Sequence, residues 1–137
     1  MSSAPGRSEV IRFVGTLRPE ELPVMVGLNV IFLLADEDGV VGRAAWAEAV
    51  AERLAALQGG IPGPAAFLLR RGPEVFRRFL DKEVVPRLAQ AGILWEGPAD
   101  GAEELVLENG FWNNVKSDRN EVMAQLEAGA AVLAEMR

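Results

Sequence analysis

The chain has 137 residues, of which 50% are hydrophobic and 25% charged, with a formal net charge of −6 and no cysteine, histidine or tyrosine. This length and apolar content predict one domain with a single core, and the missing residue types exclude disulfides, thiolate nucleophiles and zinc sites built on cysteine or histidine. The acidic balance opposes non-specific binding to phosphate polymers and anionic membranes, although it leaves local basic patches open.

The N-terminal part predicts a flexible tail over residues 1–8, followed by one domain over residues 9–137. Residues 9–14 are predicted as a short strand from their alternating apolar side chains. Residues 24–35 are almost wholly apolar but too few to span a membrane, so they predict a buried helix that begins near Leu22. Because the first residues also lack a signal-peptide pattern, we expect a cytoplasmic protein that does not contact a membrane.

An amphipathic helix is predicted over residues 44–57, where the apolar positions recur every three or four residues and form one face, made of Trp46, Val50, Leu54 and Leu57. The polar turn before it, residues 36–39, has the Asp-x-Asp-Gly spacing of part of a calcium loop. Alanine occupies the later position where such a loop needs a bidentate glutamate, so we expect neither a metal nor a cofactor.

A second long helical segment is predicted over residues 74–91, after the glycine- and proline-rich residues 58–73. Pro86 would interrupt a single helix, so two helices are possible, with the break near residues 84–85 and Pro86 opening the second. Gly92 can supply the left-handed residue that ends the segment.

This segment and the residues just before it carry the largest basic cluster of the chain, which consists of Arg70, Arg71, Arg77, Arg78, Lys82 and Arg87. Acidic neighbours offset only part of that charge. Arginine forks suit phosphates and guanine edges, so a helix that carries them could lie in the major groove of DNA. The same basic face could instead bind an acidic protein partner, or be solvated without a specific role.

A β-hairpin is predicted from residues 93–95 and 105–107, which flank a turn rich in glycine, proline and acidic residues. Its tip carries Asp100, Glu103 and Glu104, and these carboxylates would be repelled by a phosphate backbone. The hairpin therefore favours a protein partner, whereas the basic helix favours DNA. Residues 109–114 are predicted as an asparagine-rich connector.

The last helix is predicted over about residues 119–136 and carries an apolar seam with alternating steps of four and three residues. The seam either closes the core of its own domain or pairs with a second copy across a two-fold axis. We expect a homodimer whose interface includes Val122, Leu126, Leu133 and Met136.

Residues 32–41 (FLLADEDGVV), followed by the helix at 44–57, resemble the opening of MarR-like winged-helix regulators. Residues 80–94, which end in LAQAGIL, are similar to the end of the recognition helix and the entry into the wing of that family. The resemblance covers about half of the chain. It implies an α+β, mostly helical fold: a winged helix-turn-helix with a two-stranded wing and a C-terminal packing or dimerisation helix. The chain departs from the family pattern at residues 58–73, at Pro86 and at the acidic hairpin tip.

The function predicted from these features is a non-enzymatic, DNA-binding transcription regulator that contacts DNA through Arg77, Arg78 and Lys82. The alternative is a winged-helix adaptor, or a subunit of a larger assembly, that binds a protein partner and makes no DNA contact of its own. We expect no catalytic activity, because the chain carries neither a phosphate-binding loop nor a Gly-x-Ser-x-Gly nucleophile elbow. The enzymatic alternative is an acid–base pair made only of carboxylates, which would need a pocket that holds at least two of them.

Overall fold

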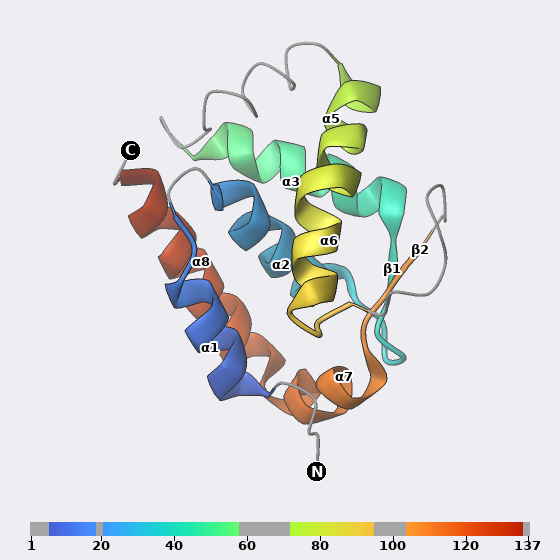
Figure 1. Cartoon of the computed structure of the whole chain (residues 1–137), viewed down its shortest axis with the longest axis vertical. Coiled ribbons are helices and arrows are strands. Elements are labelled where there is room, and N and C mark those ends of the chain that lie inside the picture. Colours follow the sequence, from blue (N-terminus) through green and yellow to red (C-terminus); the bar gives the residue numbers. More distant parts are fainter. Residues whose placement is uncertain (1–5, 19–20, 58–71, 95–103, 136–137) are drawn as a thin grey trace.

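The computed structural model describes residues 6–18, 21–57, 72–94 and 104–135, which form a mostly helical α+β arrangement with a small antiparallel sheet (Figure 1). In chain order the described elements are α1 (Arg7–Gly15), α2 (Leu22–Leu34), β1 (Val40–Gly42), α3 (Arg43–Ala56), α5 (Pro73–Phe79), the π-helix η2 (Leu80–Val84), α6 (Val85–Gln90), β2 (Glu104–Val106), α7 (Asn109–Val115), the 3-10 helix η3 (Lys116–Asp118) and α8 (Arg119–Glu135).

Helix α2 lies at the centre of the protein and packs against α3 and α8 (Figure 1). All of its residues from Leu22 to Phe32 are buried, as expected for a helix that is apolar on every side. The helices approach closely at Gly27, whose carbonyl oxygen accepts a 2.9 Å hydrogen bond from Trp46 Nε1 of α3. A Cβ at Gly27 would lie 3.1 Å from a methyl group of Val84, so the absence of a side chain lets η2 pack against α2 as well.

The helical predictions for the middle and the end of the chain are confirmed. Helix α3 covers the predicted residues 44–57 to within one residue at each end, and Trp46, Val50 and Leu54 are buried as its predicted face requires. Helix α8 covers the predicted C-terminal helix as far as Glu135, where the described residues end.

Helices α5, η2 and α6 follow one another without a break and form a single helical rod over residues 73–90 (Figure 1). The rod buries every fourth residue, namely Phe76, Leu80, Val84 and Leu88. In an α-helix with 3.6 residues per turn such a stripe would drift around the axis, and the wider turn of η2 compensates part of that drift. The break predicted near residues 84–85 is therefore a π-helical turn. Pro86 lies in the first turn of α6, and Gly92 (φ +81°) follows the end of the rod.

The sheet pairs β1 with β2 in antiparallel register, with Val41 opposite Leu105. Just beyond β2, Leu107 N donates to Gly39 O on one side, and Leu107 forms an isolated antiparallel bridge with Leu94 on the other. The predicted pairing of residues 93–95 with 105–107 is thus present at Leu94 and Leu107. The proposed tip of that hairpin lies outside the described residues, except for Glu104, and the sequence patterns did not indicate β1.

Two predictions of local structure are wrong. Residues 9–14 lie in helix α1 instead of a strand, and the segment at 109–114 lies in helix α7 instead of a connector. Helix α7 begins at a side-chain cap, because the Glu108 carboxylate accepts 2.9 Å hydrogen bonds from the backbone N–H groups of Gly110 and Phe111. Helix α1 also begins at Arg7, within the segment predicted to be a flexible tail; residues 1–5 lie outside the described ranges.

Candidate nucleic-acid interface

The helical rod presents exposed cations on the side opposite its buried stripe. Arg78 and Lys82 are four residues apart, and each is offset by two residues from the buried Leu80, which places them on the far side of the helix. Arg77 is exposed as well, next to this face. Among the residues that the structure describes, none of these three cations forms an ion pair. Their charges are therefore available to an anionic partner.

Arg77 lies on the side of the rod that faces α3. There it lines a cavity of about 490 Å³ between α3 and α5, together with the ring of Phe76 and a row of alanines on α3. Glu48 and Glu52 line the same cavity from α3. Arg77 therefore borders carboxylates, whereas the outward positions of Arg78 and Lys82 do not line this acidic cavity.

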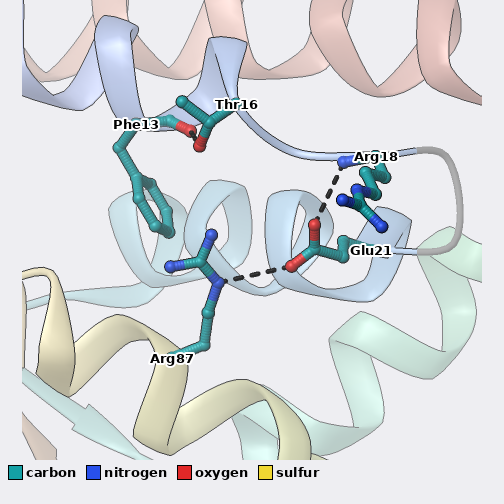
Figure 2. Close-up of polar contacts among 5 residues, drawn as sticks. All are labelled: Phe13, Thr16, Arg18, Glu21 and Arg87. Atoms are coloured by element: carbon teal, nitrogen blue, oxygen red, sulfur yellow. Dashed lines mark hydrogen bonds and ion pairs between the residues drawn. The ribbon is translucent and has the colours of Figure 1, made fainter.

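Arg87 points to a different part of the molecule and is already engaged there (Figure 2). Its Nε lies 3.3 Å from Glu21 Oε2, and its guanidinium carbon lies 5.0 Å from the centroid of the Phe13 ring. The other oxygen of Glu21 accepts a 3.1 Å hydrogen bond from the backbone N–H of Arg18. Arg87 thus connects α6 to α1 and to the start of α2, and the structure does not bring it together with Arg78 and Lys82.

The remaining predicted members of the basic cluster, Arg70 and Arg71, lie outside the described residues, as do Asp100 and Glu103 of the predicted acidic tip. Glu104 is described and is exposed on β2. The exposed cations that the structure describes on the rod are therefore Arg78 and Lys82 on its outward side and Arg77 beside the carboxylates of α3.

An ion pair that sequence patterns missed lies beside this face. Arg43 Nη1, in the first turn of α3, lies 3.0 Å from Asp81 Oδ1 in η2. Asp81 is one of the acidic neighbours of the basic cluster, but its carboxylate pairs with the buried Arg43 and not with Lys82. No local pattern could reveal this pair, because 38 residues separate its members in the chain.

Comparison with models of protein families, with curated proteins and with solved structures finds no match to this chain. The exposed basic face and its surroundings are therefore the basis for assigning a function. Among the described residues, no helix has both the length and the apolar character that crossing a lipid bilayer requires. Within the same ranges, no group of three or more histidine, cysteine, aspartate or glutamate side chains is placed to hold a metal ion.

The predicted dimerisation seam faces the interior of the chain that carries it. Val122, Leu126 and Leu133 are 1%, 2% and 7% exposed, and they belong to the same hydrophobic core as α2. Gly129, in the same seam, packs so closely that a Cβ there would lie 3.0 Å from the sulfur of Met25. Met136 lies outside the described residues. A homodimer stays a prediction, and Val122, Leu126 and Leu133 are not exposed for its interface.

Proposed function

We propose that the chain is a non-enzymatic DNA-binding regulatory protein of the winged-helix type, in which the rod at residues 73–90 is the element that contacts DNA. The order of the described elements supports this proposal: a buried helix, β1, α3, the rod, Leu94 and β2 follow one another as the parts of a winged helix do. The position of Leu107 between Gly39 and Leu94 also supports it, since in a winged helix the last strand lies between the other two.

The observation that carries the proposal is the exposure of Arg78 and Lys82 on the outward side of the rod, with no ion-pair partner among the described residues. Residues four apart in a helix are separated by about 6 Å along the axis, so both cations can contact the backbone of one DNA groove. The net charge of −6 opposes the approach of DNA elsewhere on the molecule. We therefore expect binding that depends on a small number of phosphate contacts and weakens steeply with salt.

The test is a titration of a fluorescently labelled mixed-sequence DNA duplex, followed by anisotropy at several salt concentrations. The double variant Arg78→Ala/Lys82→Ala should weaken binding and reduce the slope of log K against log salt by about 0.9 for each lost phosphate contact. The matched control is Arg12→Ala/Lys116→Ala, which removes the same charge from two exposed cations on α1 and η3. Wild-type protein without salt-sensitive affinity, or an equal loss in the control, would contradict the proposal.

One observation favours the alternative of a protein-binding adaptor. Glu48 and Glu52 stand in the cavity beside Arg77, where they would repel a DNA phosphate but could pair with the basic groups of a protein. A partner that docks in this cavity should be lost on Ala51→Trp, which fills it, and retained on Ala128→Trp, an exposed position on α8. Co-purification of the partner with Ala128→Trp but not with Ala51→Trp would support this function, and retention by both variants would contradict it.

A further inference from the structure

A second cavity, of about 280 Å³, lies where α2, α3 and α8 meet, on elements other than the basic rod. Val26, Leu57 and Ala130 give it apolar walls. Its polar groups come from one residue of each helix: Asn29 of α2, Arg53 of α3 and Glu127 of α8. A cavity with mostly apolar walls and a few convergent polar groups is typical of a small-molecule site, and this volume, just below the usual range, suits a small ligand.

Asn29 is the polar exception on a buried helix. Its side chain is 2% exposed, and its Nδ2 donates a 3.1 Å hydrogen bond to the backbone oxygen of Met123 in α8. Among the described residues, Asn29 Oδ1 accepts no hydrogen bond. This oxygen is open to solvent and is not sealed in the core, so a donor group of a ligand in the cavity could reach it.

Arg53 and Glu127, which both line this cavity, form an ion pair, with Arg53 Nη1 3.2 Å from Glu127 Oε1. The side chains are 36% and 51% exposed, so the pair is screened by solvent and contributes little to stability. A ligand that carries both a carboxylate and an ammonium can replace this pair with two new ones. A ligand with only one charge would leave either Arg53 or Glu127 without its partner.

Asn29 and Glu127 approach each other at α8. Met123, which Asn29 contacts, is one helical turn before Glu127 on α8, so the two residues are neighbours on that helix. An ammonium group has three N–H donors, enough for both the Glu127 carboxylate and Asn29 Oδ1. The cavity thus offers an acidic and amide-lined end for an amine, a guanidinium for a carboxylate, and apolar walls for a short hydrocarbon.

We propose that this cavity binds a small aliphatic α-amino acid. The ligand carboxylate pairs with Arg53, the ammonium pairs with Glu127 and donates to Asn29 Oδ1, and the side chain packs against Val26, Leu57 and Ala130. This site does not depend on the function of the basic rod, so DNA binding and amino-acid binding can each be tested without the other.

The test is isothermal titration calorimetry of the whole chain with L-leucine and L-valine, and with two analogues of leucine that each lack one charge, 4-methylpentanoate and 3-methylbutylamine. We expect saturable binding of at least one amino acid, and at least about tenfold weaker binding of each analogue, because each leaves one charged group of the cavity unpaired. No binding of either amino acid at millimolar concentration would overturn the proposal. Equal binding of one analogue would overturn the recognition of a zwitterion.

Variants of the lining residues test where on the protein the amino acid binds. Arg53→Gln and Glu127→Gln should each weaken amino-acid binding by at least about tenfold, since each removes one of the paired charges. The control variants are Arg7→Gln and Glu121→Gln, which break an ion pair of similar exposure, 42% and 61%, between α1 and α8. These controls should bind as the wild type does. Unchanged affinity in the Arg53 and Glu127 variants, or an equal loss in the controls, would place the binding elsewhere and overturn the proposal.

Discussion

Arg43 and Asp81 join the first turn of α3 to the π-helical turn η2 through a 3.0 Å ion pair between Nη1 and Oδ1. The Arg43 side chain is 8% exposed, and its Nε has no hydrogen-bond partner in the described part of the chain. The buried guanidinium therefore depends on Asp81 for the compensation of its charge. Since Asp81 directly precedes Lys82, the same pair fixes η2 against α3 where the exposed cations are presented.

Removal of the Asp81 charge should destabilise the fold. Asp81→Asn leaves Arg43 buried without a counter-charge, and we expect a loss of about 2 kcal/mol in the free energy of unfolding, below the value for a fully buried pair because Asp81 is 32% exposed. Urea denaturation measures the change. The control Glu83→Gln alters an exposed neighbour without a described ion pair and should stay within about 0.5 kcal/mol of wild type. Equal stability of the two variants would show that Arg43 does not need Asp81.

Arg87 should make little difference to DNA binding, although it belongs to the basic cluster of the sequence. Its guanidinium is engaged by Glu21 and the Phe13 ring, away from the outward side of the rod. Arg87→Ala should therefore leave the salt slope of the anisotropy titration unchanged, whereas Arg78→Ala lowers it by about 0.9. A slope reduced equally in both variants would mean that Arg87 leaves Glu21 to contact DNA.

Gly39 should not tolerate a side chain. Its φ of +77° is a conformation that L residues rarely adopt, and a Cβ there would lie 3.0 Å from Trp112 Cδ1. Gly39→Ala should lower the free energy of unfolding by about 2 kcal/mol, through backbone strain and displacement of the indole. Gly15→Ala, in α1 with open space around the new methyl group, should be neutral or slightly stabilising. Thermal unfolding of the two variants provides the comparison.

The apolar seam of α8 should behave as core. Leu126 is 2% exposed within one chain, so Leu126→Ala should cost about 3 kcal/mol through lost burial and the cavity left behind. The loss should not depend on protein concentration, because no second copy is needed to bury this residue. Unfolding midpoints at several protein concentrations test this expectation. A midpoint that rises with concentration, in wild type and less so in the variant, would support the dimer predicted from the seam.

The parts of the fold that the sequence predicted correctly depend on local patterns. Trp46, Val50 and Leu54 recur with the period of a helix, and α3 is the result. Helix α1 was mistaken for a strand because Ile11, which is 44% exposed, extends the alternation of apolar residues there. Within the helix, the buried Val10 and the partly buried Phe13 and Val14 instead fit the three- and four-residue spacing of a helical face. Helix α7 was missed because its cap is Glu108, an uncommon residue type at that position.

The relationships that define the candidate sites are not local. The pairing of Val41 with Leu105, the bond between Arg43 and Asp81, and the cavity around Asn29 each join residues far apart in the chain. The sequence could indicate a basic segment, but it could not show that Arg87 is paired while Arg78 is exposed. That difference depends on which other elements pack against each side of the rod.

The four-residue spacing of the rod has a consequence for how its surface can change. Each buried residue from Phe76 to Leu88 recurs at the same interval as the outward positions between them, so core and surface occupy separate sets of positions along one helix. Substitutions at the outward positions 74, 78, 82 and 90 should therefore change the surface of the rod while its buried stripe stays as it is.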